Sequence, residues 1–167
     1  MELETKVLSH RIQEALYNTE ETLGTAESCT GGRISEAIIA TPGSSQYFKG
    51  GIVSYTNEIK EKLLPVSHQV LEEQTAVCEE VAKEMVIGAC DALGVDYAIS
   101  ATGTAGPTGG TPDIPVGTIW LAYGSKDDVR TFLLTEDFGR DINLAIATNK
   151  ALHLFIDYLA EKHAQKA

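Results

Sequence analysis

The sequence lacks clustered basic residues. Among its 167 residues, 13 are Lys or Arg and 24 are Asp or Glu, giving a formal net charge of −11 that no basic run interrupts. A nucleic-acid or anionic-membrane surface needs clustered Lys and Arg, so we expect neither partner. A small anionic ligand remains compatible with this charge, because one well-placed Arg and a few backbone N–H groups suffice to bind it.

Cysteine and histidine are also scarce. The cysteines are odd in number and have no CxxC spacing, which argues against a disulfide framework or a zinc knuckle. The histidines are scattered without metal-site spacing, so we expect neither a metal nor a cofactor. These residues are Cys29, Cys78, Cys90, His10, His68, His153 and His163.

Long apolar runs are absent, and none approaches the ~20 residues needed to cross a bilayer. The N-terminal stretch "MELETKVLSHRIQEAL" has the pattern of a polar amphipathic helix and not of a signal peptide. With 43% hydrophobic and 22% charged residues, the composition is that of an ordinary globular protein. We therefore expect a soluble cytoplasmic protein with a single domain, residues 1–167.

Hydrophobic periodicity predicts alternating helices and strands in the first part of the chain. The last two predicted strands flank "GSKDD" and are expected to form an antiparallel hairpin. The pattern indicates an α/β domain with a mixed sheet covered on both faces. Helices are predicted at 3–18, 33–41, 57–64, 79–93 and 142–162, with a further turn near 70–73, and strands at 23–26, 47–55, 96–103, 116–124 and 129–137.

Two loops follow predicted strands, where ligands gather in such sheets. One is "AESCTGG", and the other is "ATGTAGPTGGTPDIPVG", which has five glycines and three prolines between Gly103 and Gly117. Glycine lets backbone N–H groups approach a ligand, and the second loop could hold a phosphate in this way. It is neither a P-loop nor a dinucleotide fingerprint. The alternative is a rigid crossover turn without a ligand.

The first loop holds a candidate nucleophile, Ser28, at the junction between a strand and a helix. Such a serine is either the N-cap of the helix, worth ~1 kcal/mol, or an exposed nucleophile. Cys29 is a rival, but no His lies near it in sequence, so a buried structural thiol is the alternative for it. Glu27 could balance a cation, cap a neighbouring N–H or be a solvated carboxylate.

A nucleophilic serine needs a base. A neutral lysine can serve if burial or a nearby positive group lowers its pKa from ~10.4. Lys49, Lys60 and Lys62 lie in or after the second predicted strand, and spacing alone does not choose among them. Each could equally be a solvated charge.

Arg140, in "DFGRDIN", lies just before the last predicted helix. There it could meet a phosphate at the helix N-terminus. The alternative is an ion pair with Asp137 or Asp141.

Four stretches resemble the CinA C-terminal domain family, the nicotinamide-nucleotide amidohydrolases also called PncC. They are "TAESCTGG", "GSSQYFKGGIVSYTNEIK", "ISATGTAGPTGGTPDIPVGTIWLA" and the late Arg, and the resemblance extends from about residue 5 to 160. It implies a three-layer α/β/α sandwich with a mixed sheet. It also implies a cytoplasmic homo-oligomer that converts nicotinamide mononucleotide to nicotinate mononucleotide and ammonia in pyridine nucleotide salvage.

The resemblance also implies roles for individual residues. Matched position by position, Ser28 is the nucleophile, Lys60 its general base without a metal, and Tyr55 a supporting catalytic residue. The oxyanion donors would be backbone N–H groups of "CTGG". The residues expected to contact substrate are Glu27, Cys29, Thr30, Gly31, Thr102, Gly103, Gly106 and Arg140.

Three positions depart from the family's usual pattern: Cys78 replaces a Ser, Thr104 an Ile, and "FGRD" stands where many members read "GDRD". Two other functions stay open at this point. One is a serine amidase acting on another nucleotide-like amide, and the other is a catalytically silent nucleotide-binding module. The presence of Ser28, Tyr55 and Lys60 together favours an enzyme.

Overall fold

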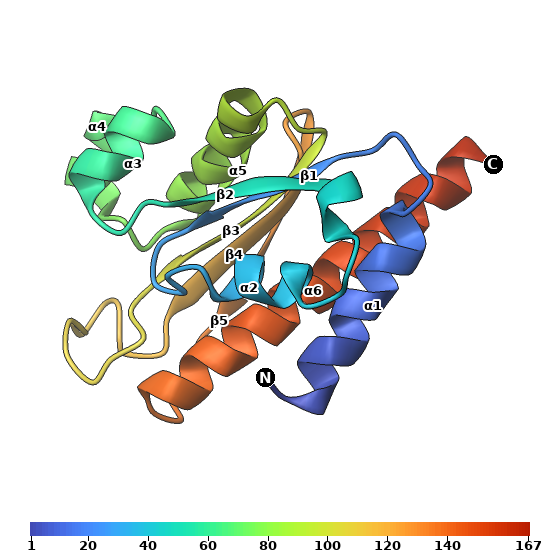
Figure 1. Cartoon of the computed structure of the whole chain (residues 1–167). Coiled ribbons are helices and arrows are strands. Elements are labelled where there is room, and N and C mark those ends of the chain that lie inside the picture. The colour runs from blue at the N-terminus through green and yellow to red at the C-terminus, as the bar shows by residue number, and fades with distance from the viewer.

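A computed structural model describes residues 1–167, which form five strands, six α-helices and one 3₁₀ turn (Figure 1). In chain order these are α1 (Leu3–Leu16), β1 (Leu23–Glu27), α2 (Arg33–Ile39), the 3₁₀ turn η1 (Ser44–Gln46), β2 (Phe48–Val53), α3 (Asn57–Leu63), α4 (His68–Gln74), α5 (Glu79–Leu93), β3 (Tyr97–Gly103), β4 (Ile119–Ser125), β5 (Asp128–Leu134) and α6 (Arg140–Lys166).

The strands form one mixed sheet in the order β2-β1-β3-β4-β5. Strand β1 pairs in parallel with both β2 and β3, whereas β4 pairs antiparallel with β3 and with β5. The hairpin predicted around "GSKDD" is confirmed, with Ser125 opposite Asp128.

The helices cover both faces of this sheet (Figure 1). Helices α1, α2 and α6 lie on one face, and α5, with α3 and α4 beside it, lies on the other. The chain leaves β1 for β2 through α2 and returns from β2 to β3 through α3, α4 and α5. Because parallel crossovers are right-handed, these two connections fall on opposite faces. The predicted three-layer α/β/α sandwich is confirmed.

Each face of the sheet has its own apolar core. Ile99 and Leu121 pack toward α1 and α6 around Phe155, and Ala98 and Ala122 pack toward α5. The alternation follows from the pleat, since successive side chains of a strand point to opposite faces. Burying one large apolar side chain such as Phe155 stabilises the fold by roughly 1.5–3 kcal/mol.

Three predicted strands are shorter in the structure: β5 ends at Leu134 and not at residue 137, and the ends of β2 and β4 turn away from the sheet. Strand β2 ends at Val53, and the next two carbonyl groups, of Ser54 and Tyr55, turn toward Lys60. Strand β4 begins at Ile119, because the residues before it close the neck of the glycine-rich loop.

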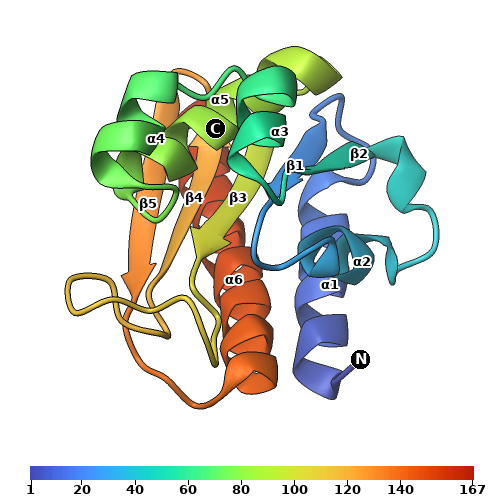
Figure 2. The same cartoon turned by 90° about the vertical axis from the view of Figure 1, so that its left-hand side faces the viewer.

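The topology places one set of loops at a single edge. Strands β1, β2 and β3 run parallel, so their carboxyl ends meet there. The connections from β1 and β2 leave in opposite directions, which makes this edge a topological switch point, where open α/β sheets bind ligands. In Figure 2 the long loop after β3 and the start of α6 lie together beyond the end of β3.

Candidate active site

Ser28 and Lys60 meet at the switch point. Ser28 directly follows β1, Lys60 lies on α3, and the lysine Nζ donates a hydrogen bond of 2.8 Å to the serine Oγ. Both residues are buried, with 7% of Ser28 and 1% of Lys60 exposed. A serine hydroxyl in hydrogen-bond reach of a possible base is the geometry of an activated nucleophile.

The amine of Lys60 is surrounded by neutral oxygens. Besides Ser28, Nζ donates to the carbonyl oxygens of Ser54 at 2.9 Å and of Tyr55 at 3.4 Å. It forms no ion pair, and burial lowers its pKa to about 8, while the nearby Cys29 opposes this weakly. With a pKa of about 8, roughly a tenth of the molecules carry the neutral amine at pH 7. Lys60 can therefore act as a base near neutral pH.

The structure resolves the choice among the three lysines that spacing left open. Lys49 donates to the carbonyls of Ser45 and Gln46 near η1. Lys62 is exposed on α3. Of the three, Lys60 alone contacts Ser28.

Cys29 follows Ser28 but is a poor candidate for a nucleophile. Its side chain is buried, and burial raises the pKa of the thiol to about 12. The thiolate is the reactive form of cysteine, so Cys29 is a neutral packing residue at physiological pH. All three cysteines are free and buried.

The loop between β1 and α2 leaves backbone donors without acceptors. The amide of Ser28 donates to the carbonyl of Ala101 on β3 at 2.9 Å, and that of Gly31 donates to the carbonyl of Ser28. The amides of Cys29 and Thr30 donate to no backbone or side-chain oxygen, although both residues are buried. Buried N–H groups without an acceptor are rare, so these two amides are suited to receive an oxygen of a ligand.

Glu27 points inward. It is fully buried, and its two carboxylate oxygens accept four hydrogen bonds, from the Thr30 hydroxyl, the Ile34 amide, and the amide and hydroxyl of Ser35. The capping role considered for Glu27 is confirmed: it caps α2, whose N-cap residue is Gly32 and has no side chain to do so. No lone pair is left over for the expected contact with a substrate.

Arg140 is the first residue of α6 and bridges two other segments. Its Nη1 donates to the carbonyl oxygen of Gly106 at 2.8 Å, and its Nη2 lies 3.5 Å from the hydroxyl of Tyr55. The alternative of an ion pair is wrong. Asp137 instead accepts from Gly139 and Asn143, and Asp141 faces Arg33 at 3.9 Å.

The Tyr55 side chain, expected to support catalysis, lies beside Arg140. Its side chain is 60% exposed and its hydroxyl lies at Arg140, with no hydrogen bond to Ser28 or Lys60. Its contact with the lysine is through the main-chain carbonyl. The side chain is thus at the rim of the site, near the guanidinium group.

The residues expected from the glycine-rich loop serve mainly to shape it. The Thr102 hydroxyl is buried and donates to the carbonyl of Ala76 at 2.8 Å. A Cβ at Gly103 would come within 2.6 Å of the Ile119 backbone, so glycine is needed for close strand packing. Gly106 has a positive φ of 85° and offers its carbonyl to Arg140.

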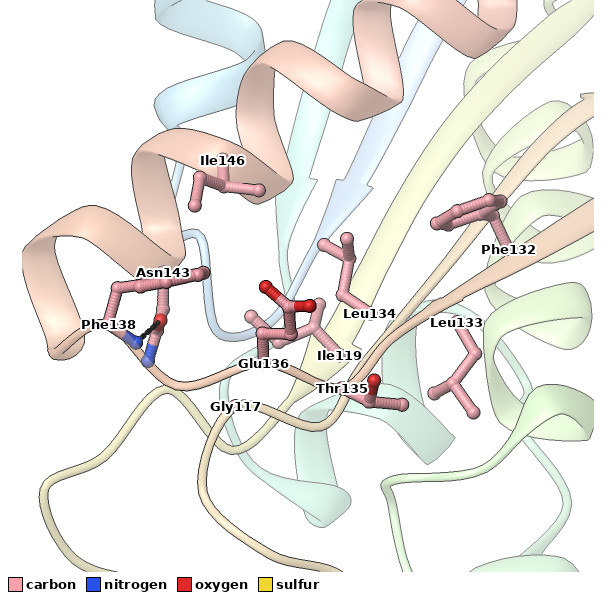
Figure 3. A pocket seen from close by; sticks show the side chains of 10 residues that line it. All are labelled: Gly117, Ile119, Phe132, Leu133, Leu134, Thr135, Glu136, Phe138, Asn143 and Ile146. Atoms are coloured by element: carbon pink, nitrogen blue, oxygen red, sulfur yellow. Dashed lines mark hydrogen bonds between the residues drawn. The ribbon is translucent and has the colours of Figure 1, made fainter.

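An apolar pocket of about 290 Å³ lies elsewhere, between β5 and the first half of α6 (Figure 3). Phe132, Leu134, Phe138 and Ile146 line it, and it contains neither Ser28 nor Lys60. This pocket was not predicted from the sequence, because its side chains come from segments that each have an ordinary amphipathic pattern.

None of the α-helices combines the length and the apolar character that a membrane span requires.

The fold and this site define an α/β protein with a buried serine–lysine pair at the switch point of its sheet. The family model described as "CinA C-terminal domain" matches residues 5–159. The chain belongs to this family.

Related sequences and structures agree with this assignment. A CinA-like protein of Leptospira borgpetersenii is 49% identical over 124 residues, which are 74% of this chain and 30% of that protein. The Escherichia coli protein named nicotinamide-nucleotide amidohydrolase PncC is 44% identical over 118 residues, 71% of this chain and 72% of that protein. The chain thus spans about a third of the length of the CinA-like proteins it matches and most of the E. coli protein.

Solved structures share the complete fold. A competence/damage inducible protein from Agrobacterium tumefaciens has a TM-score of 0.90 at 33% identity, covering 94% of this chain and 98% of that one. A CinA superfamily protein from Klebsiella pneumoniae has a TM-score of 0.89 at 32% identity, also covering 94% and 98%.

Proposed function

We propose that this protein hydrolyses the carboxamide of nicotinamide mononucleotide, giving nicotinate mononucleotide and ammonia. The observation that carries the proposal is the 2.8 Å contact between Lys60 Nζ and Ser28 Oγ, both in buried residues, with no carboxylate paired to the amine. The identity of 44% to a protein named for this activity supports the choice of substrate. The reaction would serve pyridine nucleotide salvage in the cytoplasm.

The first step is attack by Ser28. A neutral amine has two N–H donors and one lone pair, and the carbonyls of Ser54 and Tyr55 accept from two donors of Lys60. The lone pair then faces Ser28 and takes its proton as Oγ bonds to the carboxamide carbon. The carbonyl oxygen becomes an oxyanion, which the free amides of Cys29 and Thr30 receive.

The second step releases ammonia. The protonated Lys60 gives its proton to the amide nitrogen, the C–N bond breaks, and an acyl ester on Ser28 remains. Water then attacks the ester carbon and gives one proton to Lys60, which returns it to the Ser28 oxygen as the acid leaves. General acid–base help of this kind contributes ~10²–10⁴-fold, and it is effective because the pKa of Lys60, about 8, is near the working pH.

The rest of the nucleotide would lie along the glycine-rich loop and the start of α6. Arg140 is already held there by Gly106 and Tyr55, so its guanidinium can meet a phosphate with little loss of side-chain entropy. Arg140 is also the first residue of α6, and a helix N-terminus favours an anion.

Ammonia release from nicotinamide mononucleotide tests this function, with purified protein in excess chelator and with Ser28→Ala as the control. Release that survives chelation and disappears in the variant supports a serine amidase that needs no metal. Folded protein without turnover of this substrate contradicts the proposal. A panel of other nucleotide-like amides then separates a related amidase from a silent nucleotide-binding module.

We also propose that the protein acts as a homo-oligomer of single-domain chains. Phe138, just before α6, and Ile142 and Ile146, in its first half, are exposed near β5, which is an edge strand of the sheet. Proteins seldom leave such an apolar edge uncovered. Light scattering after size exclusion tests this, and a strictly monomeric mass over micromolar concentrations contradicts it.

A further inference from the structure

We infer that Glu27 is a positioning residue that holds the loop of Cys29 and Thr30 so that their amides face the oxyanion. The inference rests on the proposed serine mechanism. Its basis is the unusual placement of Glu27: a fully buried carboxylate directly before the nucleophile, with every hydrogen bond of its side chain directed into the loop and the first turn of α2.

The contacts of Glu27 use its side chain only as an acceptor. Two of its four partners are the backbone amides of Ile34, at 2.8 Å, and Ser35, at 3.0 Å, which can only donate. The hydroxyls of Thr30 and Ser35 donate to it as well, each at 2.8 Å. A carboxylate accepts four hydrogen bonds, whereas a carboxamide must donate from one end. A glutamine of the same shape therefore cannot satisfy this set.

Gly51, on strand β2, gives independent evidence that the fold leaves space for this hydrogen-bond network. A Cβ at Gly51 would lie 2.3 Å from both the Ser35 hydroxyl and the Thr25 hydroxyl. These hydroxyls are 2.6 Å apart, and Ser35 also bonds to Glu27. Because Gly51 has an ordinary φ and not a positive one, its backbone does not demand glycine. The missing side chain makes room for the network.

The same residue connects both halves of the reaction centre. The Glu27 side chain holds Thr30, in the loop with the free amides. Its main-chain carbonyl accepts from the amide of Ser54, and the carbonyl of Ser54 accepts from Lys60. The main chain of Glu27 thus positions Lys60, and its side chain positions the amides of Cys29 and Thr30. A change of the side chain alone should affect these amides and leave the position of Lys60 unchanged.

The decisive variant is Glu27→Gln, with Glu36→Gln as the matched control. Glu36 lies on α2, the helix that Glu27 caps, and its replacement removes the same charge, but its side chain is exposed. Removal of one oxyanion donor typically lowers kcat 10²–10³-fold. We expect Glu27→Gln to lower kcat on the order of 10²-fold while KM changes a few-fold at most. The pH at which kcat/KM reaches half its maximum should stay at the wild-type value.

A second measurement does not depend on the identity of the substrate. Pyridine-3-boronic acid can form a tetrahedral adduct with Ser28, and one of its oxygens then occupies the place of the oxyanion. We expect Glu27→Gln to weaken its binding by a factor similar to the loss in kcat, and Glu36→Gln to bind it normally. If Ser28→Ala abolishes boronate binding, the measurement tests the inference even when nicotinamide mononucleotide is not the substrate.

Two results overturn the inference. One is wild-type kcat in Glu27→Gln, and the other is a loss of kcat with unchanged boronate affinity. If Glu27→Gln does not fold, Thr30→Val removes only the link between the carboxylate and the loop. Thr30→Val should then lower both kcat and boronate affinity, and normal values of both in that variant would also overturn the inference.

Discussion

The Nζ atom of Lys60 lies 2.8 Å from the Oγ atom of Ser28, and no carboxylate forms an ion pair with that amine. In most proteins a buried lysine is paired with an acid, which keeps it charged. Here the amine has only a hydroxyl and two carbonyls as partners. This environment lowers the pKa of the Lys60 amine, which lies beside the Ser28 hydroxyl.

Replacement of Lys60 by methionine should remove most of the turnover. Lys60→Met keeps the length of the side chain but removes the base, and we expect kcat/KM to fall by at least 10²–10⁴-fold. Lys62→Met, an exposed change on the same helix, should leave the rate near the wild-type value. Steady-state ammonia release measures both, and substantial activity in Lys60→Met would show that another group is the base.

The pH dependence of the reaction should report the amine. Because the reactive form of Lys60 is neutral and its pKa is lowered to about 8, kcat/KM should rise with pH and reach half its maximum near pH 8. An enzyme that is fully active at pH 6 would contradict this role for Lys60. The profile is best measured in buffers of constant ionic strength.

Lys60 should also reduce the stability of the fold at neutral pH. Its pKa is about 8 in the folded protein and 10.5 when unperturbed, so charging it in the folded state costs on the order of 3 kcal/mol. The cost is fully present below pH 8, decreases as pH rises toward 10.5, and vanishes above it. Lys60→Met should therefore raise the free energy of unfolding at pH 7, less the cost of leaving the Ser54 carbonyl without its donor.

Urea denaturation of both proteins across this pH range tests the sign of the predicted change in the free energy of unfolding. The stability difference between Lys60→Met and wild type should be largest below pH 8 and shrink between pH 8 and 10.5. A difference that is constant with pH would mean that Lys60 titrates alike in the folded and unfolded states.

Arg140 should discriminate substrates by their phosphate. We expect Arg140→Gln to lower kcat/KM for nicotinamide mononucleotide about 10- to 100-fold, as for loss of a hydrogen bond to a charged group. The rate with nicotinamide riboside, which has no phosphate, should change little. Equal losses on both substrates would place the role of Arg140 in loop structure, through its bond to Gly106.

Cys29 should be dispensable for the chemistry. Its buried thiol has a pKa raised to about 12 and is therefore protonated and unreactive at neutral pH. Cys29→Ser should retain activity within a few-fold, and iodoacetamide should not inactivate the wild-type protein. Loss of activity on alkylation of Cys29 would reopen it as the nucleophile.

The sequence predicts the layered fold well because the periodicities are strong. The apolar stripe of α5 predicts both of its ends, 79 and 93. The predicted extension of β2 through Ser54 and Tyr55 was wrong, since tertiary bonds to Glu27 and Lys60 turn those residues away from the sheet. The local sequence pattern of a strand carries no information about hydrogen-bond partners that only the tertiary structure supplies.

The site was less predictable than the fold. Spacing could not separate Lys60 from Lys62, since only the folded position of α3 shows which amine reaches Ser28. Glu27 could be assigned as a cap only once α2 was placed beside it. Ser54 and Gly51 were missed altogether, because one acts through its main chain and the other through the side chain it lacks.

Ser28, the proposed nucleophile, is held by the last backbone hydrogen bonds of the sheet. The amide of Ser28 bonds to Ala101 on one neighbouring strand, and the carbonyl of Glu27 bonds to Ser54 beyond the other. Moving Ser28 therefore requires β1 to separate from both of its neighbours, β2 and β3, an event that belongs to global unfolding and not to local motion of a surface loop. Hydrogen exchange at the Ser28 amide should be as slow as in the core. Any motion that admits a substrate must then occur elsewhere, in the glycine-rich loop and at the Tyr55 rim.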